Sequence, residues 1–205
     1  MKKDDLGAGQ WQALWFSIWD DVGAALRLLR ADDSQFGKRT FIRTAFATIE
    51  GIVACIKHEI LQNASTLHHL SPSELAILRE EVYSIDNKGK VFIQPRFIPI
   101  DVNVRFTLDA LITTNQVAIQ VNYSAEGWRA FKSAVRVRNR ITHPNVRADF
   151  EVSGREVDEA LAALKWIEQE ACQVLEKSVE RLRDESATMT EEMMRLKKTT
   201  EQLRG

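Results

Sequence analysis

Apolar residues recur three and four positions apart over two long segments in the first third of this chain, and this spacing restricts what it can form. Such a period places apolar side chains on one face of an α-helix, so a helix is predicted over Gln10 to Arg30. A second is predicted over roughly Lys38 to Leu61, where the apolar arc is broad enough for a central helix. The tryptophans of the first helix are expected to be core residues. An all-α domain follows.

The composition agrees with one helical domain. A chain of 205 residues buries a core without needing a metal or a disulfide, and its 9 Gly and 4 Pro are few for a turn-rich β-protein. Cys55 and Cys172 lie too far apart in the sequence for a disulfide framework or a zinc spacing, so no metal or cofactor is expected. Without a long apolar run or a signal-like N-terminus, we expect a cytoplasmic protein that does not bind membranes.

Local signals predict where further helices begin. Ser71-Pro72-Ser73-Glu74 is a capping box that starts a short helix running to about Tyr83, and Asn87-Lys88-Gly89 follows as a stop. Ser124 is a plausible N-cap for a helix that ends at His143-Pro144. A second capping box, Ser153-Gly154-Arg155-Glu156, begins a long C-terminal helix.

The segment at about 84–123 is predicted to be a short irregular or β-like insertion. Its two prolines, Pro95 and Pro99, indicate a loop or an edge hairpin. The next residues alternate like a strand and also fit a helical period, so the pattern alone leaves both open. We favour a helix over about Asn103 to Asn115, followed by an extended stretch at 117–121.

The last part of the chain is charged and helical in pattern. Apolar residues fall every seven positions, at Leu175, Leu182, Met189, Leu196 and Leu203. Three residues after each of the first four stand Ser178, Glu185, Glu192 and Thr199, and a coiled coil needs a second apolar stripe. We therefore predict a helical domain over residues 1–182 and a protruding or frayed helical tail over 183–205.

Charge is uneven along the chain although the net charge is −1. Residues 128–147 hold no Asp or Glu and carry six cations, which are Arg129, Lys132, Arg136, Arg138, Arg140 and Arg147. Such a surface favours an anionic partner. On a helical wheel Lys132, Arg136 and Arg140 lie on the polar arc, where they would contact an RNA backbone.

Arg138 breaks this pattern because it lies within the apolar arc. An unpaired guanidinium there would cost several kcal/mol, so it must meet a carboxylate, a phosphate or a water-filled cleft. One alternative is a structural ion pair with Glu50, with His143 acting only as a C-capping residue. In an ideal helix His143 projects about 140° away from Arg138, so a centre using both needs a distorted helix exit or a second subunit.

These residue types suit cleavage of a phosphodiester. A histidine can take the proton from a ribose 2′-hydroxyl or return one to the leaving oxygen, and an arginine can hold the phosphate through two hydrogen bonds. Asn139 stands four residues before His143, on the same helix face, and is expected to orient the imidazole or a ligand.

The stretch Arg138-Asn139-Arg140-Ile141-Thr142-His143 resembles the signature of the HEPN superfamily, an Arg, a polar residue and a His four to six positions after the Arg. The resemblance implies a bundle of four or five helices and a homodimer in which two motifs form one metal-independent ribonuclease centre. It also implies that Arg138 binds the phosphate, His143 is the acid or base and Asn139 orients. Some HEPN toxins carry a tyrosine two residues after the histidine, where this chain has Asn145.

The function expected from the resemblance is an endoribonuclease that leaves a 2′,3′-cyclic phosphate, in a toxin–antitoxin or phage-defence setting. Its expected partners are a second copy of the chain, RNA and an antitoxin or regulatory protein. The alternative is a non-catalytic HEPN dimer that binds nucleotide or RNA or scaffolds a defence complex. A purely structural role for the motif is a third reading.

Overall fold

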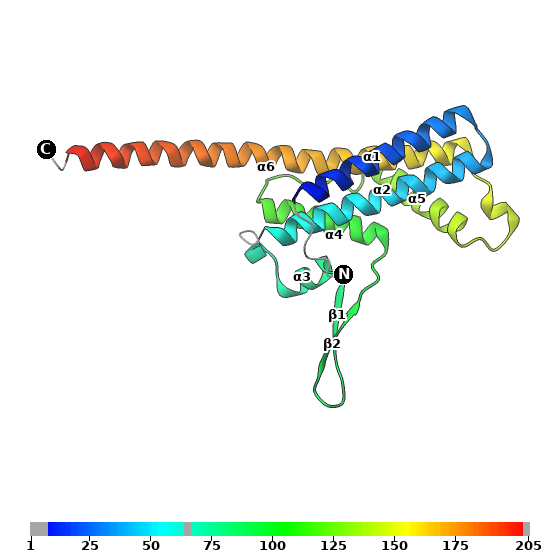
Figure 1. Cartoon of the computed structure of the whole chain (residues 1–205), viewed down its shortest axis with the longest axis horizontal. Helices are drawn as coiled ribbons and strands as arrows, with labels where there is room; N and C mark the ends of the chain where they lie inside the picture. Colours follow the sequence, from blue (N-terminus) through cyan, green and yellow to red (C-terminus); the bar gives the residue numbers. More distant parts are fainter. Residues whose placement is uncertain (1–7, 64–66, 203–205) are drawn as a thin grey trace.

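A computed structural model describes residues 8–63 and 67–202 (Figure 1). This part of the chain forms a mostly helical body with one hairpin. The helices are α1 (Ala8–Ala31), α2 (Gln35–Gln62), α3 (Pro72–Leu78), α4 (Ile100–Asn115), α5 (Glu126–Thr142) and α6 (Gly154–Gln202). The strands are β1 (Glu81–Ile85) and β2 (Val91–Pro95), and short 3₁₀ turns lie at η1 (Leu67–His69) and η2 (Arg147–Phe150).

Helix α2 is the central element, as its broad apolar arc predicted. Phe41, Ile42, Ile49 and Ile52 are fully buried, and α2 contacts α1, α4, α5 and α6. The Oγ of Ser34 accepts the backbone N–H of Gly37 at 3.1 Å and so caps its first turn. Burial of large apolar side chains around one helix holds the body together.

Both predicted capping boxes are present. In the box that begins α3, the Glu74 N–H donates to Ser71 Oγ at 3.3 Å and the Ser71 N–H donates to Glu74 Oε2 at 2.7 Å. The Ser153 box repeats both bonds at the start of α6. The Ser124 prediction was wrong by one position, because Ala125 is the N-cap of α5 while the Ser124 hydroxyl donates to Asn122.

The region after α3 differs from the sequence prediction. Helix α3 ends at Leu78 instead of near Tyr83, and Glu80 takes a left-handed backbone with φ of 55°. Strands β1 and β2 then pair antiparallel with Tyr83 opposite Ile93. Asp86 Oδ1 accepts the N–H groups of Lys88 and Lys90, so the predicted helix stop is a hairpin turn.

The rest of the insertion follows the favoured reading in part. Helix α4 is present and starts at Ile100, three residues earlier than expected. Its C-cap, Gln116, lies in the left-handed region with φ of 51°. Residues 117–121 are irregular and form no strand.

Helix α6 runs without a break across the boundary suggested at 182–183. Its buried side chains end at Ser178, and the described side chains beyond Leu182 are exposed. Figure 1 shows this half of α6 projecting away from the body. No described helix is long and apolar enough to cross a membrane.

Candidate functional site

Helix α5 packs against the rest of the body through an apolar face, and its candidate functional side chains lie outside that face. Its buried residues are Trp128, Phe131, Ala134, Val137 and Ile141. They fall three or four positions apart, as the helical wheel predicted, and Phe131 stacks on Phe46 of α2 with ring centroids 6.3 Å apart. This packing fixes the rotation of α5 about its axis and therefore the directions of its polar side chains.

The guanidinium of Arg138 meets a carboxylate from α2. Its Nη2 donates to Glu50 Oε1 at 2.5 Å, and its centre lies 5.9 Å from the middle of the Phe46 ring. The side chain is 29 % exposed, so the pair lies at the rim of the α2–α5 contact. Of the environments expected for Arg138, the structure provides a carboxylate, and Glu50 is the residue that the structural alternative named.

Asn139 contacts Arg138 through its side chain. Arg138 Nη1 donates to Asn139 Oδ1 at 3.1 Å, so the amide and Glu50 together hold the guanidinium in place. Between Asn139 and His143 there is the backbone hydrogen bond of the helix, in which the Asn139 carbonyl accepts the His143 N–H at 2.9 Å, while the Asn139 side chain holds Arg138.

His143 terminates α5 and is exposed. It is the C-cap residue, with φ of −125° and ψ of 65°, and Pro144 follows it. Among the described residues its ring has no hydrogen-bond or ion-pair partner. The backbone therefore leaves the helical conformation at His143, the position where the sequence analysis expected the helix to end. The imidazole is open to a ligand.

The segment after His143 is anchored by Arg140. Its Nη1 donates to the carbonyl oxygens of Asp149 at 3.3 Å and Glu151 at 2.8 Å, and its Nη2 pairs with Glu156 Oε1 at 2.6 Å. Arg140 was predicted to bind RNA, but these donors are engaged within the fold. Its observed role is to join α5, η2 and the first turn of α6.

Two further groups order the same segment. Asp149 Oδ2 accepts the N–H groups of Asn145 at 2.7 Å and Val146 at 3.1 Å, and these two hydrogen bonds lower the pKa of the Asp149 carboxyl. Ionised Asp149 therefore stabilises the turn after Pro144 at neutral pH. This support is lost as the pH falls through its lowered pKa.

Three residues of α2 hold the end of α5 and the segment after it, and they were not identified from the sequence. Gln35 makes two hydrogen bonds to the backbone of Val152, Arg39 Nη1 donates to the Phe150 carbonyl at 2.9 Å, and Arg43 Nη2 donates to the Ile141 carbonyl at 3.2 Å. Their spacing of four residues indicates one face of α2. Nothing in the sequence identifies the segment that this face meets.

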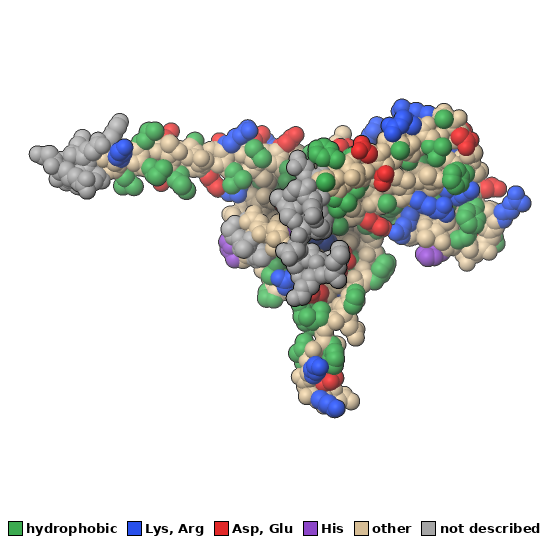
Figure 2. All heavy atoms as spheres, viewed as in Figure 1, with side chains coloured by type: hydrophobic (Ala, Val, Ile, Leu, Met, Phe, Trp, Pro, Cys, Tyr) green, Lys and Arg blue, Asp and Glu red, His purple; other side chains and the backbone are tan. Residues whose placement is uncertain are grey.

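The remaining cations of α5 face solvent. Lys132 and Arg136 are exposed, lie four positions apart and pair with no carboxylate in the described ranges 8–63 and 67–202. Figure 2 shows Lys and Arg side chains gathered over the end of the body where α5 terminates. The predicted RNA-contacting residues thus divide into two free cations and the engaged Arg140.

Replacing Arg140 with methionine is expected to destabilise the protein by about 1–3 kcal/mol, because its charged hydrogen bonds to η2, to the Glu151 carbonyl and to α6 are lost. The free energy of unfolding in urea measures this change. Arg136→Met is the matched control on the same helix and is expected to change the free energy of unfolding by less than about 0.5 kcal/mol. Equal effects of the two substitutions would contradict the anchoring role.

Comparison with protein-family models, with curated proteins and with solved structures found no match for this chain.

Proposed function

We propose that this protein is a metal-independent endoribonuclease of the HEPN type that acts as a homodimer. The observation that carries the proposal is the end of α5, where the His143 ring is exposed and unpartnered among the described residues while Glu50 and Asn139 fix the Arg138 guanidinium. A proton-transfer group and a phosphate-binding group on adjacent turns suit cleavage by a ribose 2′-hydroxyl, and a second copy of the chain supplies the second proton-transfer group.

The proposed reaction uses both copies of the motif. One His143 takes the proton from the 2′-hydroxyl, and the 2′-oxygen attacks the adjacent phosphorus. The bond from phosphorus to the 5′-oxygen breaks, and the second copy's His143 protonates that oxygen. The products are a 2′,3′-cyclic phosphate and a 5′-hydroxyl, and Arg138 stabilises the charge that develops on the phosphoryl oxygens.

Lys132 and Arg136 supply the proposed contacts to the RNA backbone. Both are exposed on the solvent face of the helix that carries Arg138 and His143. Cations in such a row release counterions from the phosphates on binding, which gives affinity without sequence preference and makes it depend on salt. A toxin–antitoxin or phage-defence setting, with an antitoxin or regulatory protein as restraint, is the biological context we propose from the HEPN resemblance.

One observation favours a second candidate, a non-catalytic dimer that binds RNA or nucleotide or scaffolds a defence complex. Glu50 already accepts a hydrogen bond from Nη2 of the Arg138 guanidinium, and no described side chain hydrogen-bonds to the His143 ring. If Glu50 does not yield to a phosphate, the cations bind RNA without turnover.

Incubating purified protein with labelled single-stranded and hairpin RNA in excess EDTA separates these candidates. We expect the RNA to be cut, and DNA of the same sequence to stay intact because it lacks the 2′-hydroxyl. RNA that is bound but uncut supports the non-catalytic dimer. Cutting that appears only when a divalent metal is added contradicts the proposed mechanism.

A further inference from the structure

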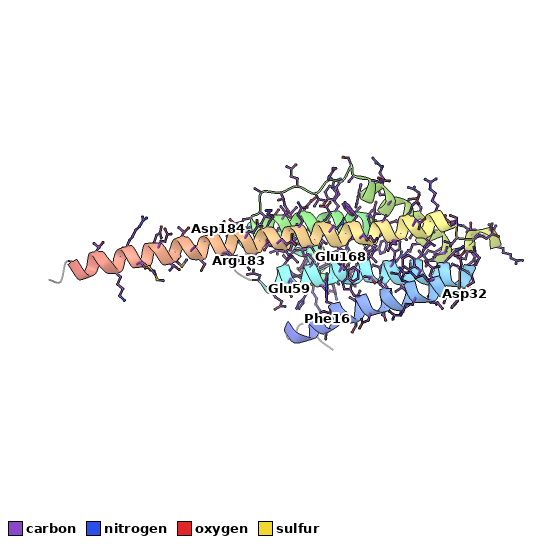
Figure 3. The ribbon with its side chains drawn as sticks, turned by 90° about the horizontal axis from the view of Figure 1, so that it is seen from above. Phe16, Asp32, Glu59, Glu168, Arg183 and Asp184 are labelled. Atoms are coloured by element: carbon purple, nitrogen blue, oxygen red, sulfur yellow. The ribbon has the colours of Figure 1, made fainter. Side chains whose placement is uncertain are left out.

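The projecting half of α6 carries exposed apolar side chains. Val179, Leu182, Met189, Met193 and Leu196 are between 46 and 68 % exposed. Figure 3 looks down on α6 and shows the helix passing over the body at Glu168 and leaving it near Arg183 and Asp184. About 30 Å of helix follows Leu182, at a rise of 1.5 Å per residue.

These side chains belong to two stripes along α6. The second stripe lies four residues after the first. Leu175, Leu182, Met189 and Leu196 occupy the d positions of a heptad, and the a positions are Cys172, Val179, Ser186 and Met193. The sequence continues the pattern with Thr200 at a and Leu203 at d. We call the eight residues from Cys172 to Leu196 the α6 seam. An alternation of three and four residues is the requirement for a coiled coil.

We propose that a second copy of this chain occupies the α6 seam and forms a parallel two-stranded coiled coil. A seam with this alternation is complementary to itself, so a second copy satisfies it without any other partner. Leucine at most d positions together with a β-branched Val179 at an a position favours two strands. The open groove on α6 that Val179, Leu182 and Ser186 line lies along the same face.

The charges that flank the seam select the parallel orientation. Glu185 and Glu192 occupy g positions, while Arg183 and Lys197 occupy e positions. In a parallel pair a g position faces the e position of the next heptad in the other copy. Glu192 of each copy therefore faces Lys197 of the other, which gives two such pairs, and no like charges face each other. In an antiparallel pair g faces g, which brings Glu185 against Glu192 and is unfavourable.

The parallel pair is independent of the proposed ribonuclease centre, since the seam contains no residue of α5. It places both bodies at the same end of the coil. The proposed function needs contact between two α5 ends, and a dimer joined at α6 raises the local concentration of each body for the other. A substitution in the α6 seam that leaves the protein dimeric therefore contradicts the coiled coil. A protein that forms the coiled coil but does not cut RNA contradicts the proposed ribonuclease centre.

Two methionines of the projecting helix provide a matched pair for the first test. Met189 lies in the seam at 63 % exposure, and Met194 lies outside it at 62 %. We expect wild-type protein to be dimeric in sedimentation or light scattering, Met189→Lys to raise the dissociation constant at least tenfold, and Met194→Lys to leave it unchanged. A monomeric wild-type protein at micromolar concentrations, or a Met189→Lys protein as dimeric as wild type, would overturn the proposal.

A cysteine pair tests the orientation. In a Cys172→Ser background, Met193→Cys is expected to form an intermolecular disulfide on mild oxidation, whereas Met194→Cys, on the outer face, is not. An antiparallel pair that matches a with d across the same seam aligns residue 193 with residue 182 of the other copy, which separates the two cysteines by about 16 Å. Failure of Met193→Cys to cross-link above the Met194→Cys control would overturn the parallel arrangement.

Discussion

His143→Ala is expected to slow RNA cleavage by a factor of about 10² to 10⁴, the usual contribution of one acid–base group. The ring is exposed and has no hydrogen-bond or ion-pair partner among the described residues, so its loss costs little packing. We therefore expect the free energy of unfolding to change by less than about 0.5 kcal/mol. Single-turnover cleavage rates and urea unfolding of the same preparations measure the two effects together.

A histidine outside the site provides the control for this prediction. His68 is exposed and lies in η1, near the start of α3, with its ring centroid 3.8 Å from that of His69. His68→Ala is expected to cleave RNA at the wild-type rate. Cleavage by His143→Ala at a rate within threefold of wild type would remove His143 from the mechanism, and a large loss of stability would show that its role is structural.

Arg138→Lys is expected to lower the cleavage rate by about 10² to 10³, the cost of removing one donor that stabilises charge in a transition state. Lysine retains the positive charge and can still pair with Glu50, but it cannot form the planar pair of hydrogen bonds to a phosphate. Because the ion pair is partly exposed, the free energy of unfolding should fall by about 1 kcal/mol or less. Arg136→Lys, on the same helix, should cleave within a few-fold of wild type.

Glu50→Gln tests the same pair from the other side. Glutamine keeps an acceptor oxygen for Arg138 and removes one negative charge near the proposed phosphate position. For charges about 6 Å apart in water this change strengthens RNA binding about threefold. Fluorescence anisotropy with a labelled RNA measures the affinity. Unchanged or weaker RNA binding by Glu50→Gln would show that Glu50 does not oppose a phosphate at Arg138.

The helical body could be predicted because its signals are local. Apolar periodicity located α1, α2, α5 and α6, and two capping boxes located the starts of α3 and α6 within a residue. The hairpin was assigned in part to a helix because a stop signal and a hairpin turn share the same residues, Asp86 to Gly89. Which of the two forms depends on whether the flanking segments pair, and the turn residues alone do not determine that.

The candidate site was predicted less completely than the fold. The place of Arg138 within an apolar arc was enough to require an anionic neighbour, and Glu50 was one of the alternatives. Arg39 and Arg43, which hold the segment after His143 and the end of α5, come from a helix about 100 residues earlier in the chain. Contacts between elements so far apart depend on packing angles, which a helical period does not encode.

The second stripe of α6 was missed for a different reason. If Leu175, Leu182 and Met189 are a positions, their companions stand three residues later and are polar. Read as d positions, the same residues have companions four residues later, at Val179, Ser186 and Met193. The pattern was present in the sequence, and the exposure of these side chains in the structure made the second register evident.

The central claim is that RNA is cut by its own 2′-hydroxyl at a site containing Arg138 and His143. Mass spectrometry of the fragments formed by wild-type protein in EDTA tests it most directly. We expect 2′,3′-cyclic phosphate and 5′-hydroxyl ends, formed by wild type and, at a rate about 10² to 10⁴ lower, by His143→Ala. Fragments with 3′-hydroxyl and 5′-phosphate ends would contradict the account. They form when water attacks the phosphorus and the bond to the 3′-oxygen breaks, which does not involve the 2′-hydroxyl.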